Sequence, residues 1–524
     1  MLLLNRRPSN TSMALIVIAI ILGLLGYHGL FFPITPKFNI SAPRSRGSVP
    51  ANKGGAESPV PIPPEYGIVS ESADGKHHRG ACFDTDSAEY LRGLRSHAVE
   101  YCPSTSGASI TCFHGTTTGQ GRDSFCIARD VVLDEETGRF RLDCDIGSAG
   151  QMKPSGGIAF FDERQGQLET SDVFDKYFQI GRKTKGMLPS PLSIDDSQAE
   201  QSNYTILVKR EDTANFWGSL MEILSMMLSV DILRMSSDSR LGDSIIAIPA
   251  DLPRTQVIIL DDFPEGPVYD LWSFFAGSAP IRFEDILEGQ ARADALLSAH
   301  TAIVALPGGS NPLAQIGGDD VSDCRNSAIA KTFARRVLQH YHVSYRGKHL
   351  FGSVKVVFVQ TATHKVKDNI HLIKALRRAF PAPKVIAYAA NFAALPMADQ
   401  LTIVHSADVL IGAHGAELSH IMFMREGHGA VVEIQRAGLT QTRYRNLAAL
   451  LGRKYFLAEA EAVPIDQAGS RKASVEQDHG GATPNAVEVE LARRDAWDKV
   501  ELVISEEDFV AQVGLAIEAV AGGS

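Results

Sequence analysis

The sequence lacks the concentrated positive charge that nucleic-acid-binding proteins carry. Its 524 residues have a formal net charge of −10 and a pI near 5.9, with no basic stripe. We therefore expect no nucleic-acid partner. Internal repeats are not evident either. With 44% hydrophobic and 21% charged residues, the chain is long enough for two globular domains with substantial hydrophobic cores.

Cysteine pairs of the C-x-x-C type are also absent, which disfavours a zinc cluster. Of the six cysteines, Cys324 stands far from the other five. In an oxidising compartment the five suggest two local disulfides, and the sixth cysteine either completes a third disulfide or is free. The clustered cysteines are Cys82, Cys102, Cys112, Cys126 and Cys144.

One long run, residues 13–32, is apolar apart from His28. A helix of this length can cross a hydrocarbon core of about 30 Å. Arg6 and Arg7 precede the run without an acidic residue, so residues 1–12 are predicted to be a cytoplasmic tail. A cleaved signal peptide is the alternative. The run is longer than a usual signal-peptide core and lacks a clear small-x-small cleavage site, which favours an uncleaved transmembrane signal anchor.

Residues 33–65 are rich in proline, glycine and serine and have little to bury, so they predict a flexible stem. N-glycosylation sequons begin at Asn39 and Asn203, and both would face the lumen in this orientation. We place a first lumenal domain, with a Cys-rich and irregular start, at residues 66–345. A second domain follows at residues 346–524.

Apolar runs predict the regular elements of both domains. In the second domain strands and helices alternate at short spacing, which is typical of a parallel sheet covered by helices and predicts a Rossmann-like domain. A polar loop and a last helix with a capping-box start complete the chain. The predicted strands are residues 204–209, 257–260, 354–360, 384–388, 408–411 and 430–434; the predicted helices are residues 215–233, 328–340, 369–380, 396–406 and 505–521; the loop is residues 464–497.

Residues 408–435 read as strand, glycine turn, helix and second strand, with Gly412 and Gly415 on either side of His414. Backbone N–H groups at the start of the helix would be free to bind an anion such as a phosphate. Both His414 and Glu433 fall at carboxyl ends of strands, where ligands bind in open α/β sheets. The alternative is an ordinary strand-to-helix turn with a capping histidine.

The motif VLIGAHGAELSHIMFM…VVEI resembles the signature of glycosyltransferase family 61. The order Asn215-Phe-Trp…Glu222, then VIILDDF, RVLQHYHV and VKVVFVQ, is also similar to that family. The resemblance covers roughly residues 204–458. It implies a GT-B-type fold of two Rossmann-like domains, with the first domain on the acceptor side and the second binding a nucleotide sugar.

The resemblance also implies an activity. We expect a membrane-anchored, inverting transfer of N-acetylglucosamine from UDP-GlcNAc to Ser/Thr hydroxyls of secretory-pathway proteins. The expected location is the Golgi or endoplasmic reticulum membrane, in a single-pass type II orientation. The alternatives are a pentosyl (xylosyl) transferase acting on a polysaccharide, and a non-catalytic family member that binds glycans or a partner protein.

The candidate general bases are Glu222 and His414, although Glu222 could instead cap or orient its helix. Amides at the start of the helix after His414 would stabilise charge on the departing diphosphate. The candidate residues for binding the nucleotide sugar are Asn215, Gln360, Gly412, His414, Gly415, Ala416, Glu417, Ser419 and Glu433.

The chain departs from the family pattern at two positions. Gly218 stands where a histidine is expected, and Gln360 stands where a strand usually ends in arginine. Glutamine cannot replace an arginine that grips a phosphate, which puts activity in doubt. Lys365 and Lys367 are candidates to replace the missing charge.

A required metal is not expected. Asp84-Thr-Asp86 has the D-x-D form that metal-dependent transferases use to hold Mn²⁺ with a diphosphate, but it is remote in sequence from the donor turn.

Overall fold

The structure is a computed structural model, and residues 60–524 form one compact unit in it. The predicted signal anchor, the stem before residue 61, both sequon asparagines and nearly all of the predicted loop at 464–497 lie outside the described residues. The structure describes residues 61–70, 86–102, 108–115, 124–134, 139–142, 178–180, 204–210, 213, 215–237, 244–247, 251, 255–288, 301–317, 324–343, 353–360, 365–439, 441–464 and 500–522.

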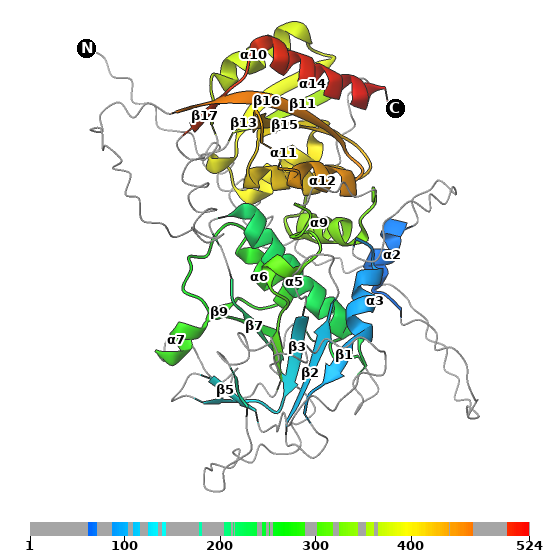
Figure 1. Cartoon of the computed structure of the whole chain (residues 1–524), viewed down its shortest axis with the longest axis vertical. Coiled ribbons are helices and arrows are strands. Elements are labelled where there is room, and N and C mark those ends of the chain that lie inside the picture. The colour runs from blue at the N-terminus through cyan, green and yellow to red at the C-terminus, as the bar shows by residue number, and fades with distance from the viewer. Residues whose placement is uncertain are drawn as a thin grey trace, which may run out of the picture. The chain divides into compact units, whose positions relative to one another are not determined.

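The first sheet has seven strands (Figure 1). Their order is β1 (Ala98–Glu100), β2 (Ser109–His114), β3 (Ser124–Arg129), β10 (Thr301–Val304), β7 (Tyr204–Val208), β8 (Thr255–Ile259) and β9 (Ile281–Arg282). From β1 to β10 neighbouring strands run antiparallel, and from β10 to β9 they run parallel. A separate small sheet contains β4 (Val132–Asp134), β5 (Arg139–Leu142) and β6 (Phe178–Ile180).

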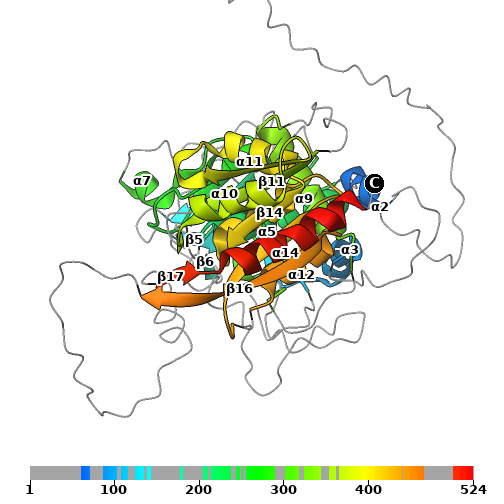
Figure 2. The same ribbon diagram turned by 90° about the horizontal axis from the view of Figure 1, so that it is seen from above.

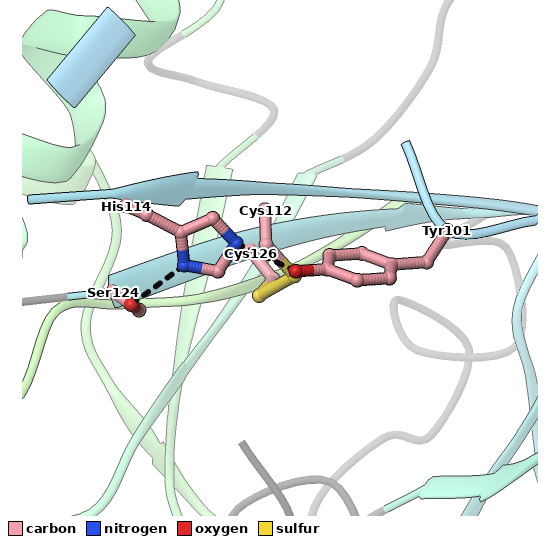
Figure 3. The surroundings of a disulfide bond; sticks show 5 residues. All are labelled: Tyr101, Cys112, His114, Ser124 and Cys126. Carbon is pink, nitrogen blue, oxygen red and sulfur yellow. Dashed lines mark hydrogen bonds between the residues drawn. A yellow bond between two sulfur atoms is a disulfide. The ribbon is translucent and has the colours of Figure 1, made fainter. Parts of the chain in front are cut away.

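Strands β1 to β3 correct the expectation of an irregular start to the first domain. Their runs of three to six residues are short and interrupted by polar residues, so the sequence pattern is weak. The antiparallel pairing of β3 with β10 nevertheless makes them part of the main sheet. Cys112 lies opposite Cys126 in the register of β2 and β3, and the two form a disulfide (Figure 3). Cys102 and Cys324 each take part in a disulfide as well, so the distant sixth cysteine is not free.

His114 links three strands beside this disulfide (Figure 3). Its Nε2 lies 2.8 Å from the Tyr101 hydroxyl and its Nδ1 lies 2.9 Å from the Ser124 hydroxyl. Tyr101 follows β1, His114 ends β2 and Ser124 begins β3, so these hydrogen bonds tie the three strands together. Burial raises the pKa of Tyr101 to about 12, which keeps its hydroxyl protonated at neutral pH.

The second sheet also has seven strands and holds the predicted Rossmann-like series. Their order is β12 (Lys365–Val366), β17 (Val500–Val503), β16 (Lys454–Pro464), β15 (Ala430–Arg436), β14 (Val409–Ala413), β11 (Val354–Gln360) and β13 (Val385–Asn391). From β16 to β13 the strands run parallel, and β17 runs antiparallel to β16. The mixed α/β class predicted from the sequence is confirmed.

The helices fall close to their predicted positions, with one change of type. The segment after His414 forms a 3-10 helix, η6, in place of the expected α-helix. The helices are α2 (Pro64–Ser70), α3 (Glu89–Ser96), α5 (Phe216–Met235), α6 (Asp270–Ala276), α7 (Phe283–Leu287), η4 (Gly308–Ser310), α9 (Ala328–His340), α10 (Asn369–Ala379), η5 (Phe392–Ala394), α11 (Met397–Ser406), η6 (Ala416–Phe423), α12 (Arg443–Leu450) and α14 (Glu506–Ala521).

Helices cover both faces of the second sheet. Val356 and Phe358 of β11 pack into a core with α10 and α14, and α14 crosses several strands on that face (Figure 2). Val357 and Val359, which alternate with them, belong instead to a core shared with α5, α9, α11, η6 and α12. Because successive side chains of a strand point to opposite faces, β11 contributes to both cores. The shared core also includes first-sheet residues, so it joins the two sheets.

Helix α5 is the one helix among the described residues that is long and apolar enough to span a membrane. In the structure 94% of its apolar 18-residue window is buried inside the protein. It packs in the shared core and contacts α3, α6, η4 and η6. Its apolar character is therefore explained by its central position in the fold.

Candidate active site

His414, directly after β14, lies side by side with Glu433 of β15. The register pairs Gly412 with Glu433, and the His414 N–H donates to the Ile434 carbonyl at 2.8 Å. This pairing holds the ring next to the carboxylate, with Nδ1 of His414 2.5 Å from Oε1 of Glu433. β15 runs on to Arg436, so Glu433 lies three residues before the end of its strand, whereas the sequence suggested that it lies at the end.

The carboxylate of Glu433 is completely buried and is held from two sides. Tyr455 of β16 donates its hydroxyl to Oε2 at 2.7 Å, while the His414 ring approaches Oε1. Burial, and then the charge of Glu433, raise the pKa of Tyr455, so its hydroxyl remains a donor. A buried carboxylate with two donors is well suited to orient a histidine ring.

The second ring nitrogen of His414 points away from Glu433. Its Nε2 lies 2.5 Å from Oε1 of the exposed Gln441, and the His414 side chain is 12% exposed. When Gln441 moves aside, Nε2 is the nitrogen that can reach a ligand. Because the Gln441 oxygen can only accept, Nε2 is a donor in this arrangement, as a hydrogen-bond donor to phosphate would be. A general base at Nε2 requires this bond to Gln441 to be broken.

Aromatic rings form one side of the site. The Tyr444 ring lies edge-on to His414 with 5.3 Å between centroids, and Trp217 lies edge-on to Tyr444 at 6.4 Å. Burial raises the pKa of Tyr444. Trp217 comes from the first turn of α5 and Tyr444 from the first turn of α12. Elements from both halves of the fold therefore meet at His414.

The turn after His414 has the geometry of a compact anion-binding loop. Among the described residues, none accepts a hydrogen bond from the N–H of Gly415 or Ala416. Ser419 is buried and donates its hydroxyl to the Ala416 carbonyl at 2.5 Å, which stabilises η6 internally. A Cβ at Gly412 would lie 2.9 Å from Leu418, so the glycine allows η6 to pack closely against β14.

The remaining predicted residues lie in other surroundings. Asn215 caps α5: its side-chain oxygen accepts the N–H of Trp217 at 3.0 Å and of Gly218 at 3.3 Å. Glu222 is 5% exposed and packs against η4, where a Cβ at Gly308 would lie 2.5 Å from its Cγ. Gln360 ends β11 and donates its amide to Asn369 at 2.7 Å. Glu417 is in the first turn of η6.

Lys365 and Lys367 stay predicted replacements for the missing arginine. Lys365 is in β12, which begins five residues after Gln360 and is an edge strand of the second sheet. Lys367 donates its backbone N–H to Leu502.

Sequence reasoning missed several residues of the site. Tyr455 could have been found from the sheet, because it pairs with Val431, two residues before Glu433, on the same face. Arg443 and Tyr444 belong to α12, which follows β15, and Gln441 precedes that helix; they carry no sequence signal of their own. Trp217 belongs to α5, far away in the sequence. The missed residues are Arg443, Tyr444, Tyr455, Gln441 and Trp217.

Within the described part of the chain no group of three or more His, Cys, Asp or Glu side chains is arranged to hold a metal ion. Asp84 of the D-x-D triplet lies outside the described residues.

The comparison with protein families finds one similarity in this part of the chain. Residues 324–432, from the segment that forms α9 to β15, match the family model described as Glycosyltransferase 61. The match includes β11, β14, His414 and η6 and ends one residue before Glu433. The resemblance to this family is therefore confirmed.

Known proteins are similar to a limited part of the chain. The EGF domain-specific O-linked N-acetylglucosamine transferase of Mus musculus is 30% identical over 138 residues, which is 26% of this chain and 25% of that protein. The protein of the same name from Bos taurus is 29% identical over 138 residues, and that from Drosophila melanogaster is 24% identical over 135 residues. The match thus spans about a quarter of the length of each of these relatives and supports a glycosyltransferase.

Proposed function

We propose that the protein transfers N-acetylglucosamine from UDP-GlcNAc to Ser/Thr hydroxyls of proteins, with inversion at the anomeric carbon. The observation that carries the proposal is the His414–Glu433 pair, inside or next to the matched family region and near the carboxyl ends of two parallel strands. The transferred sugar and the protein acceptor follow the names of the relatives, and the UDP donor follows the family resemblance.

In the proposed reaction the acceptor oxygen attacks the anomeric carbon on the face opposite UDP. The bond from that carbon to the β-phosphate oxygen breaks, and its electron pair leaves with UDP. The proton of the acceptor hydroxyl passes to a base. The N–H groups of Gly415 and Ala416 would receive the charge that develops on the diphosphate.

His414 and Glu222 are both kept as proposed bases. His414 is favoured because its Nδ1 is held by Glu433 while its Nε2 contacts the exposed side chain of Gln441. Glu222 lies against the turn at Gly308 and is 5% exposed, which favours a structural role in α5. The remaining predicted binding residues, Asn215, Gln360, Gly412, Glu417 and Ser419, are proposed to shape the donor pocket through the contacts described above.

We further propose a GT-B-type arrangement in which the first sheet serves the acceptor and the second the nucleotide sugar. The location is proposed to be the Golgi or endoplasmic reticulum membrane, with residues 13–32 as a type II anchor. No metal is proposed to be required. Activity that survives a chelator agrees with this, and activity restored only by Mn²⁺ contradicts it.

A panel of UDP sugars tests the proposal. The full-length protein is incubated with each donor, and release of UDP is measured with and without a Ser/Thr-containing protein acceptor. We expect turnover of UDP-GlcNAc above that of UDP-xylose, with stimulation by the acceptor. A preference for UDP-xylose supports the pentosyltransferase alternative.

The non-catalytic alternative is favoured by one observation, the replacement of the expected arginine by Gln360. It predicts that a glycan raises the melting temperature of the protein while no UDP sugar does so. That result would overturn the proposed transferase activity.

A further inference from the structure

Arg443 lies beside the candidate active site, and its side chain has no hydrogen-bond or ion-pair partner among the described residues. It is the first residue of α12, next to Tyr444 of the candidate active site. Its Nε is buried without a hydrogen-bond acceptor, and among the described residues no carboxylate forms an ion pair with its guanidinium. A buried donor that lacks an acceptor needs an explanation, because leaving it unpaired is unfavourable.

Two buried arginines of this fold use most of their donors on protein oxygens. Arg210 bonds to the Asp261 carboxylate and to three backbone carbonyls. Arg453 donates to the carbonyls of Met424, Arg425 and His428 at 2.6 to 2.7 Å, although its Nε is unpaired like that of Arg443. Both are structural links between loops. The half-buried Arg443 differs from them because none of its side-chain donors is hydrogen-bonded to a described residue.

The guanidinium is nevertheless held in place. Its Cζ lies 5.6 Å from the centroid of the Trp217 ring, a cation–π contact. On another side is Gly317, where a Cβ would lie 3.8 Å from Nε and from Nη2. Thr442 donates to the Gly317 carbonyl at 3.3 Å, which fixes that loop against α12. The contacts with Trp217 and Gly317 orient the side chain. Its N–H groups make no hydrogen bond to the described residues.

Arg443 lies next to the candidate active site, where the arginine expected from the family pattern is missing. Tyr444 packs edge-on against His414, and the positive charge of Arg443 lowers the pKa of Tyr444 against the larger effect of burial. Arg443 is therefore close to the ring that contacts His414. The family pattern expects an arginine at the end of β11, but Gln360 stands there and its amide is bonded to Asn369. Lys365 and Lys367 lie in and just after β12, an edge strand that follows β11 in the chain.

We propose that Arg443 binds the diphosphate of the nucleotide sugar and supplies the positive charge that is missing at Gln360. The inference rests on the proposed function and names a residue that the family motif does not contain. A guanidinium can donate two parallel hydrogen bonds to phosphate oxygens, which a lysine ammonium cannot do in the same geometry. Trp217 holds the fork in orientation, and Gly317 leaves room beside it.

Binding to the full-length protein by calorimetry tests this role, with UDP, uridine and inorganic pyrophosphate as ligands. The variants are Arg443→Gln, Arg443→Lys and, as the matched control, Arg378→Gln. Arg378 is exposed on α10 and pairs with Glu506. We expect Arg443→Gln to weaken UDP binding by about 10- to 100-fold. Arg443→Lys should fall between this variant and the wild type. Uridine binding, and UDP binding by the control, should not change.

Arg443 makes no hydrogen bond to described residues, so Arg443→Gln is expected to keep the wild-type melting temperature. If this variant melts lower, Arg443→Lys is compared with Arg378→Lys, and it must still lose UDP affinity relative to that control. Equal UDP affinity of Arg443→Lys and Arg378→Lys would then overturn the inference.

The outcomes separate this inference from the proposed function. If the wild type binds UDP and Arg443→Gln binds it equally well, the role of Arg443 is overturned and the proposed function stands. If the wild type binds pyrophosphate through Arg443 but does not bind UDP, the anion site stands and the proposed function is overturned. Binding of neither ligand by the wild type overturns both.

Discussion

Parallel strands end in arginine-containing sites in both sheets, and the two sites differ in what the arginine binds. After β7 and β8, Arg210 is 1% exposed, and its N–H groups are bonded to Asp261 and to the carbonyls of Phe263, Pro264 and Glu265. After β14 and β15, Arg443 rests on Trp217 and donates to no described residue.

The difference indicates how a charged residue with a structural role can be distinguished from one that binds a ligand at the end of a strand. Burial alone does not do so, because Arg210 and Glu433 are both buried. The number of donors that the protein itself satisfies is the better guide. At the first sheet all of them are satisfied, so the loop is closed to an anion. At the second sheet the donors of Arg443 and of the Gly415 turn remain available.

The largest effect is expected from replacing His414, the histidine of the candidate active site. His414→Ala should lower turnover of UDP-GlcNAc by about 100- to 10,000-fold if His414 is the general base. Glu222→Gln is the matched variant of the other proposed base and should retain most of the activity. Steady-state kinetics of both variants make the measurement. A fully active His414→Ala removes the histidine from the mechanism, and an inactive Glu222→Gln with normal UDP binding makes Glu222 the base.

The second-largest effect is expected from replacing Arg210, whose donors are all bonded within the protein. Arg210→Met leaves Asp261, whose side chain is 4% exposed, buried without its cation. We expect a loss of about 3–5 kcal/mol in the free energy of unfolding, measured with urea. Arg443→Gln should leave this free energy nearly unchanged. If the two variants are equally stable, the distinction between a structural and a ligand-binding arginine fails.

A smaller effect is expected from removing the hydrogen bond that Tyr455 donates to Glu433. Tyr455→Phe removes one of the two donors to this buried carboxylate. The free energy of unfolding should fall by about 1–3 kcal/mol, because a buried charge acceptor loses its partner. Tyr388→Phe is the control, since its hydroxyl pairs with the neutral Ser406. A loss no larger than that of the control would show that Glu433 does not depend on Tyr455.

The most gradual effect, spread over a range of pH, concerns the junction between the two halves. His420 of η6 stacks on Phe216 of α5 at 4.5 Å between centroids, and burial lowers its pKa to about 4. The unfolded chain, with a pKa near 6.5, then binds the proton more readily than the folded protein. Stability should therefore fall as the pH drops from about 6.5 to about 4, by at most about 1.4 kcal/mol per pH unit.

This dependence is measured by urea unfolding across that pH range. His420→Gln should remove the slope that comes from this residue. An unchanged slope in the variant would mean that His420 is not buried in its neutral form at the junction.

Much of the second sheet could be predicted because its strands are continuous apolar runs. Residues 354–360 became β11 and residues 328–340 became α9 at the predicted bounds. The first sheet was predicted less well, since β2 and β3 are short and mix polar with apolar residues. Their place depends on pairing with β10, about 180 residues later, and local sequence carries no signal for such a pairing.

The site was predicted where the motif is local. His414 and Glu433 belong to neighbouring strands, so their meeting follows from parallel pairing. Arg443 and Trp217 come from separate helices, and only the packing of α5 and α12 around η6 brings them together. For Asn215 the local sequence did not indicate the role that the structure shows. Its position suggested a ligand contact, whereas its side-chain oxygen is used to cap α5.

A structure of the full-length protein with UDP is the most direct test of the central claim. The account predicts the diphosphate within hydrogen-bond distance of the Gly415 and Ala416 amides and of the Arg443 guanidinium, with His414 beside it. A diphosphate bound elsewhere, for example at the carboxyl ends of β7 and β8 near Arg210 and Asp261, would contradict the account.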